Sequence, residues 1–308
     1  MMSYAFEVVG VFGAGSGGGS PLAVVYEAEG LGPEEMAWVA ARLRVDETVF
    51  VLPPTAPGAT HRVRVFTRAG ESPYGGHSAV GTAVALVRSG RLPAGRVVQQ
   101  CGEKLTELRA DGERAVLAAS GPQPVRPLDA APLLAAAGLS PGDLGEGPVL
   151  AAGFGPLFHL LPVRAEAVAA ARVDTAAMER HGLPDLCVFH WDASERTATA
   201  RLFAPGYAIE EDAACASVGL ALGVWLADVG IPEPEAETAY GFRIVQGVEL
   251  GRPAVLECTV APAADPLTVT VAGAAPRELA GSLTDPAGEA AGAQAVAGAR
   301  ARRTSSAA

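Results

Sequence analysis

Three short segments carry side chains that could move a proton. In ESPYGGHSAVGTA, Gly75 and Gly76 precede His77 at the expected start of a helix. Glycines let backbone amides approach a ligand, and the free N–H groups of a helix start favour an anion such as a carboxylate. Histidine titrates near neutral pH, although His77 alone would more often cap or pack against a helix end. The glycine pair and nearby Glu71 make His77 the best site candidate among the five histidines.

The second segment, EEDAACASVG, places three consecutive acids before a helix of small apolar residues. Acids at a helix start stabilise it by ~0.3–1 kcal/mol each, so the run has a purely structural interpretation. Three acids exceed what capping requires, and one that entered an apolar pocket would have a shifted pKa. Cys215 near this helix start could transfer protons, although buried cysteine usually acts as a small hydrophobe.

The third segment is DETVFVL, expected to be a strand. Strand alternation places Glu47 on the same face as Val49 and Val51. A carboxylate there is costly to bury unless it is paired or kept protonated for acid–base catalysis. The alternative interpretation is a solvated acid at the edge of the strand.

Other chemistries lack the patterns that they need. GAGSGGGS at 13–20 matches GxGxxG but is followed by Pro21 and a strand-like run, whereas a dinucleotide site needs a helix there. No GxSxG elbow or papain-like cysteine context appears. The four cysteines form no CxxC pair and the histidines lack zinc-ligand spacing, so we expect reduced thiols, no metal and a cytoplasmic protein.

The composition of the chain argues against two classes of binding partner, nucleic acids and membranes. The 34 acidic and 23 basic side chains give a formal net charge of −11, which argues against nucleic acid. The chain is 49% hydrophobic with a mean hydropathy of +0.25. Its longest strongly apolar run, 213–227, is shorter than the ~20 residues that cross a bilayer. We therefore expect no membrane association, and the N-terminus has no pattern of a secretory signal.

The elements that must position these side chains follow the same order twice. Strands rich in β-branched residues, an amphipathic helix at 32–44 and a small-residue helix at 78–90 make up the first part. Strands, a helix at 175–182 and a second small-residue helix at 216–230 follow a proline- and glycine-rich connection at 121–147. Both small-residue helices should be buried. We therefore predict an α+β fold with an N-terminal half at 1–123, a C-terminal half at 124–275 and a disordered tail at 276–308.

Several motifs together resemble the phenazine-biosynthesis PhzF-like family over residues 4–275. They are DETVFVL, RVFTRAGESPYGGHSAVGTA, GFGPLFHLLPV, RLFAPGYAIEEDAACASVG and IVQGVELGRPAVL, in that order. The resemblance implies a fold similar to diaminopimelate epimerase, with two α/β halves, each a curled, barrel-like mixed sheet around a central helix. The site would lie in the cleft between them.

The resemblance also implies an activity. Best-known members isomerise a dihydro-hydroxyanthranilate-type ring without a cofactor, as an acid takes a proton and returns it elsewhere. Glu47 matches that acid/base, and His77 and Asp212 match its two partners. The positions expected to bind the substrate carboxylate and the rest of the ligand are Ser20, Gly75, Gly76, Ser78, Cys215, Ala216 and Ser217. We expect a small carboxylated substrate of secondary metabolism, such as antibiotic biosynthesis, and a homodimer.

Some positions depart from the family pattern. Ser20 stands where asparagine is usual, Arg68 replaces a proline, and Cys215 with Ala216 replaces Thr-Gly. Ala216 adds a methyl group where a ligand would approach, and Arg68 is expected beside the cleft, where it would meet an extra carboxylate. Two alternatives stay open: an epimerase or racemase whose second proton donor is Cys215 or Asp212, and a binding or resistance protein without catalysis.

Overall fold

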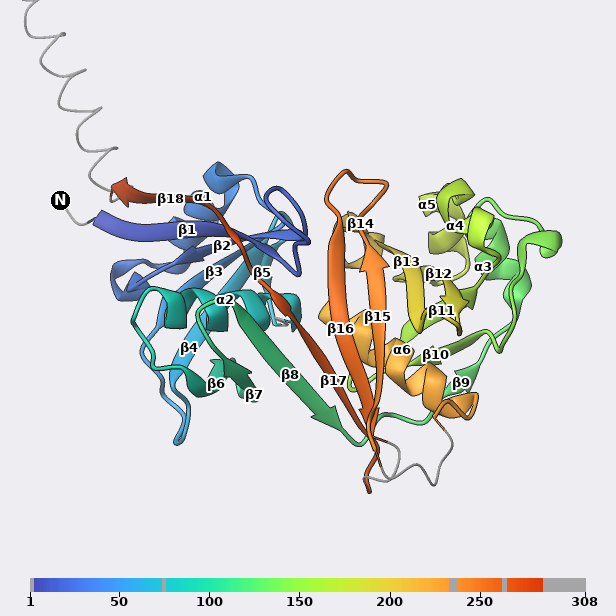
Figure 1. Ribbon diagram of the computed structural model, residues 1–308. Coiled ribbons are helices and arrows are strands. Elements are labelled where there is room, and N and C mark those ends of the chain that lie inside the picture. The colour runs from blue at the N-terminus through green and yellow to red at the C-terminus, as the bar shows by residue number, and fades with distance from the viewer. Residues whose placement is uncertain (1–2, 74–75, 233–237, 262–264, 285–308) are drawn as a thin grey trace, which may run out of the picture.

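The computed structural model describes residues 3–73, 76–232, 238–261 and 265–284 (Figure 1). In the N-terminal half, a curled sheet surrounds helix α2 (Gly76–Arg88), and α1 (Pro33–Leu43) covers the opposite face of the sheet. Strands hydrogen-bond in the order β1 (Ser3–Val11), β2 (Ser20–Val25), β3 (Glu47–Leu52), β4 (His61–Thr67), β6 (Gly95–Cys101), β7 (Lys104–Ala110) and β8 (Arg114–Ser120), with β5 (Gly70–Ser72) on β4. Pairs β2–β3 and β4–β6 are parallel, and the others are antiparallel.

The C-terminal half repeats this pattern around helix α6 (Ala216–Asp228). Its strands pair in the order β10 (Leu150–Ala152), β11 (Phe158–Pro162), β12 (Leu186–Asp192), β13 (Thr197–Ala204), β15 (Tyr240–Gln246), β16 (Ala254–Ala261) and β17 (Thr268–Ala274), with β14 (Ile209–Asp212) on β13. Pairs β11–β12 and β13–β15 are again the parallel ones. The outer face is covered by α3 (Ala130–Ala136), α4 (Ala165–Ala170) and α5 (Thr175–Arg180). The predicted architecture of two halves, each with a sheet curled around a buried helix, is confirmed.

Two strand exchanges and one central pairing join the halves. Strands β8 and β17 pair antiparallel and lie side by side between the two central helices (Figure 1). The short β9 (Arg126–Pro127), which follows β8, pairs with β10, and β18 (Arg277–Thr284), which follows β17, pairs with β1. The chain thus returns to its first strand, and each half uses a strand that follows the other half in sequence.

Strand β18 corrects the predicted tail. We expected disorder from residue 276 onward, but residues 277–284 pair with β1 along its length, from Leu279 opposite Val8 to Thr284 opposite Ser3. Alanine, glycine and serine give this segment little strand-like hydrophobic pattern. Its pairing with β1 therefore stabilises it as a strand. The rest of the predicted tail, 285–308, lies outside the described residues.

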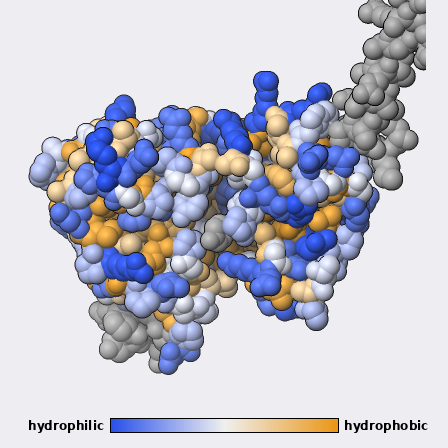
Figure 2. Space-filling view, turned by 180° about the vertical axis from the view of Figure 1, so that it is seen from behind, coloured by the Kyte–Doolittle hydropathy of each residue, from blue (hydrophilic) through white to orange (hydrophobic). Residues whose placement is uncertain are grey.

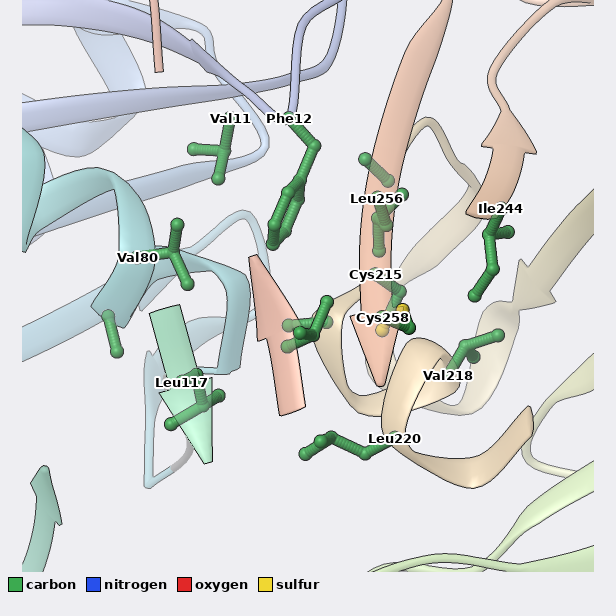
Figure 3. Packing of buried hydrophobic residues seen from close by; sticks show 14 of the residues in the cluster. Val11, Phe12, Val80, Leu117, Cys215, Val218, Leu220, Ile244, Leu256 and Cys258 are labelled. Atoms are coloured by element: carbon green, nitrogen blue, oxygen red, sulfur yellow. The ribbon is translucent and has the colours of Figure 1, made fainter. Parts of the chain in front are cut away.

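The largest hydrophobic cluster of the described residues runs through both halves. Figure 3 shows Val80 of α2 and Leu117 of β8 on one side and Val218 of α6 with Leu256 of β16 on the other, with Phe12 above. Ten of the 13 residues of α2 and ten of the 13 residues of α6 are buried, as the small-residue pattern predicts. Small residues let helix and sheet pack closely: a Cβ on Gly81 would lie 2.6 Å from the Leu22 side chain, and one on Gly223 2.4 Å from Val269.

The molecular surface shows the same division. Seen from behind, the halves form two lobes with a furrow between them, mostly polar with apolar patches on both (Figure 2). None of the helices in the described ranges has the length and apolar character needed to cross a bilayer.

Candidate active site

Glu47 begins β3 and lies on the inner face of the N-terminal sheet. Val49 and Val51 belong to the core around α2, whereas Phe50 packs in the separate cluster under α1, as strand alternation predicts. The side chain of Glu47 is therefore buried, with the residue only 7% exposed. Its Oε2 atom forms no hydrogen bond within the described part of the chain.

His77 lies at the start of α2, next to Glu47. Its Nε2 atom is 3.5 Å from Glu47 Oε2, and the histidine is itself buried. The preceding residue, Gly76, brings the starts of the two central helices together, because a Cβ there would be only 2.8 Å from Ser217 Oγ at the start of α6. The N–H groups at two helix starts thus lie at one place.

Asp212 comes from the other half, at the end of β14. Its Oδ1 accepts hydrogen bonds from Ser20 Oγ and from the Ala214 amide, both at 3.1 Å. The acidic run is therefore a strand that pairs with β13, not a turn that opens α6. Of its three acids only Asp212 is buried, while Glu211 forms a two-pronged ion pair with Arg201, at 2.9 and 2.8 Å.

Gln246 is a residue that sequence reasoning missed. It ends β15, is 1% exposed, donates from Nε2 to the Asp212 carbonyl at 2.8 Å and accepts from the Cys215 amide at 3.4 Å. It thereby fixes the segment between Asp212 and α6. The sequence did contain a signal for Gln246. Strand alternation places it on the same inward face as Phe242 and Ile244, and a polar side chain buried on that face needs hydrogen-bond partners.

A cleft of about 390 Å³ lies between the halves and contains the acid–base residues. Glu47, His77 and Asp212 all line it. Phe158 and Tyr207, on its C-terminal side, stack with ring centroids 6.5 Å apart and an interplanar angle of 24°. These two rings give one wall of the cleft an apolar character that the sequence reasoning did not assign.

A larger cavity of about 600 Å³ on the other side of β14 contains none of the three acid–base residues, so we place the chemistry in the smaller cleft. Arg68 lines the larger cavity, with its side chain 73% exposed and 3.9 Å from Asp46. Arg68 therefore does not line the cleft that contains Glu47, and its contact with an extra carboxylate stays a prediction. Thr67 and Ala69, its neighbours, line the cleft instead.

The positions expected to bind substrate divide into two groups. Gly76, Cys215 and Ser217 line the cleft. Ser20, Ser78 and Ala216 are fully buried and do not line it. Ala216, whose methyl group was expected where a ligand approaches, is thus not among the residues that line the cleft, and Gly75 lies outside the described residues.

The pKa values of Glu47, His77 and Asp212 are all raised in the folded protein. Burial raises the pKa of Glu47, an effect that the charge of His77 opposes and the like charge of Asp212 strengthens. Burial also raises the pKa of Asp212, against the opposing effects of His77, the Ala214 amide and the Ser20 hydroxyl. Burial alone lowers the pKa of His77, but Glu47, Asp212 and Asp46 together raise it above its usual value. A carboxyl with a raised pKa is a stronger base than a solvated one, which suits it to taking up a proton.

These shifts predict how stability depends on pH. Because the pKa of Glu47 is raised in the folded state, the folded protein binds more protons than the unfolded chain above the ordinary value of 4.5. Its contribution to the free energy of unfolding should therefore fall as pH rises from there, by about 1.4 kcal/mol for each unit of raised pKa. Denaturant unfolding at several pH values should show Glu47→Gln gaining stability relative to the wild type as pH rises. A constant difference would contradict the raised pKa.

Comparisons with known proteins show the family and the fold of this chain. A family model described as phenazine biosynthesis-like protein (PhzC-PhzF) matches residues 9–281. The trans-2,3-dihydro-3-hydroxyanthranilate isomerase of Pseudomonas fluorescens is 32% identical over 257 residues, 81% of this chain and 88% of that protein. A PhzF-family phenazine biosynthesis protein of Bacillus anthracis has a TM-score of 0.82 at 20% identity, covering 92% of this chain and 100% of its own. A predicted epimerase of Pseudomonas aeruginosa has a TM-score of 0.75 at 27% identity, covering 91% and 99%.

Proposed function

This chain belongs to the phenazine biosynthesis-like (PhzC-PhzF) family and is an isomerase, and from this premise we propose that it shifts a proton between two carbons of a small cyclic carboxylate. We propose that the substrate belongs to the class of trans-2,3-dihydro-3-hydroxyanthranilate. This compound appears in the name of the Pseudomonas fluorescens isomerase that is 32% identical to this chain. Such a ring compound would place the enzyme in secondary metabolism.

The observation that carries this proposal is the buried carboxyl of Glu47 in the cleft. Burial raises its pKa, so the carboxylate is a stronger base than a solvated glutamate and its acid form can return the proton. His77, with Nε2 at 3.5 Å, balances the negative charge of the ionised form. Taking a proton from one carbon and returning it to another needs no net oxidation or reduction, so the proposed reaction uses no cofactor.

The cleft also suits a small planar acid. No arginine or lysine is among the described residues that line it, so a substrate carboxylate would bind at the helix starts around Gly76 and Ser217. The stacked rings of Phe158 and Tyr207 offer an apolar wall to the ring of the substrate. A substrate held between these two features would have its carbons near Glu47, which lines the same cleft, and such positioning is a large part of what a proton shift requires.

Incubation with trans-2,3-dihydro-3-hydroxyanthranilate in heavy water should test the proposal. We expect NMR spectra to show a product with the carbon-bound hydrogen moved and deuterium at the new position. Heat-denatured protein serves as the control for spontaneous rearrangement.

The outcome separates the proposal from the alternative of an epimerase. Deuterium entering at a stereocentre with loss of optical rotation, and no shift of a double bond, would indicate epimerisation. That reaction needs a second acid–base group, and Cys215 is poorly suited as the base because burial raises its thiol pKa well above the usual range. Absence of any exchange at carbon in this substrate would contradict the proposed substrate class.

A further inference from the structure

Ser20 occupies a buried position between the two halves of the site, and the proposed function gives it no task. It begins β2, is 0% exposed and does not line the cleft. We propose that Ser20 relays a proton between His77 and Asp212, so that Glu47 and Asp212 act as one acid–base unit. This inference rests on the proposed isomerase reaction.

The distances describe a continuous chain of four polar groups. Glu47 Oε2 lies 3.5 Å from His77 Nε2, which lies 3.4 Å from Ser20 Oγ. Ser20 Oγ in turn donates to Asp212 Oδ1 at 3.1 Å. All four residues are at most 7% exposed, and Ser20, which does not line the cleft, is 0% exposed. The chain connects β3, α2 and β2 of one half with β14 of the other.

The backbone holds Ser20 in this place from both sides. Gly19 has φ 76°, and a Cβ there would lie 2.3 Å from the Val11 carbonyl oxygen, so only glycine fits the turn before Ser20. Arg252 of the C-terminal half donates from Nε to the Gly19 carbonyl at 2.7 Å. A position fixed from both halves keeps the hydroxyl aligned with its two partners.

A hydroxyl can accept one proton while it donates another, which allows a balanced transfer. After Glu47 has taken a proton from a substrate carbon, protonated His77 gives its Nε2 proton to Ser20 Oγ as the Ser20 hydroxyl proton moves to Asp212 Oδ1. His77 Nε2 then takes the proton from Glu47. Glu47 is again a carboxylate, Asp212 is a neutral acid, and His77 and Ser20 end as they began.

The relay gives the second carboxyl a role in the reaction. Asp212 lines the cleft, so once protonated it can deliver a proton to a second carbon of the substrate. Other titratable groups facing the chain are Asp46, which is next to Glu47 in sequence, and the Cys215 thiol. Neither bridges His77 and Asp212, so the path depends on Ser20.

Two substitutions at Ser20 test the relay. Ser20→Ala removes the hydroxyl and should lower kcat about 10- to 100-fold with little change in KM, because substrate contacts stay in place. Ser20→Thr keeps a hydroxyl and should recover most of the rate. If Ser20→Ala retains the wild-type kcat, or if both variants lose the rate equally while remaining folded, the relay is wrong.

A readout without substrate separates this inference from the proposed function. Nitrogen-15 NMR of the His77 ring in the free protein should show the same Nε2 chemical shift in the wild type and in Ser20→Thr, where a hydroxyl contacts Nε2, and a different shift in Ser20→Ala. The charge coupling between His77 and Asp212 should persist in all three proteins. An identical Nε2 shift in all three would overturn the relay even if isomerisation is observed. Absence of turnover in the wild type with a Ser20-dependent Nε2 shift would instead count against the proposed substrate reaction alone.

Discussion

Glu47→Gln should lower kcat by about 10²- to 10⁴-fold while the protein stays folded. Glutamine has nearly the same shape as glutamate but cannot accept a proton from carbon, so it removes the base and keeps the packing. It also removes a carboxyl whose pKa is raised by burial, so the variant should be at least as stable as the wild type at neutral pH. Turnover followed by NMR and thermal unfolding followed by circular dichroism measure the two effects.

Glu210→Gln is the matched control for the loss of one acidic charge. Glu210 is exposed on β14 and does not line the cleft, so this variant should keep the wild-type rate. A Glu47→Gln protein with a rate close to that of the wild type would show that another group takes the proton. In that case Asp212→Asn would be the variant that abolishes turnover.

The local part of the site could be predicted from sequence because it depends on periodicity. Alternation along one strand places Glu47 on the inner face, and a helix start fixes His77. The contact between Ser20 and Asp212 joins residues 192 apart in the chain, and no local pattern encodes it. The direction of Arg68 could not be predicted from periodicity, because it lies in the turn between β4 and β5, where strand alternation does not apply.

The fold shows the same division between local and distant determinants. The composition of a buried small-residue helix such as α2 predicts it from the sequence, and the repeated order of elements predicts two similar halves. The pairing of β18 with β1 does not follow from either, because residues such as Ala280 and Gly281 carry no strong strand preference. Only the open edge of β1, formed by the first residues of the chain, gives this segment a place to pair.

A chain that ends at Pro276 should be less stable than one that ends at Thr284 by at least about 3 kcal/mol, because an entire ladder of backbone hydrogen bonds at about 0.5–1.5 kcal/mol each is lost. The shorter chain also exposes the edge of β1 and the ring of Phe6, which packs against Gly281. Urea unfolding of the two chains measures the difference. Equal stabilities would show that β18 adds nothing to the fold.

The same truncation should also affect catalysis, through Arg252. This arginine donates to the Gly19 carbonyl before Ser20 and forms an ion pair with Glu278 of β18 at 2.7 Å. Loss of β18 removes the Glu278 partner and leaves Arg252 freer, so the turn that holds Ser20 loses part of its support. Glu278→Gln in the full chain separates the two effects: it should reproduce part of the loss in kcat with little of the loss in stability. If it lowers stability as much as truncation does, the ion pair, and not the strand pairing, holds β18 to the molecule.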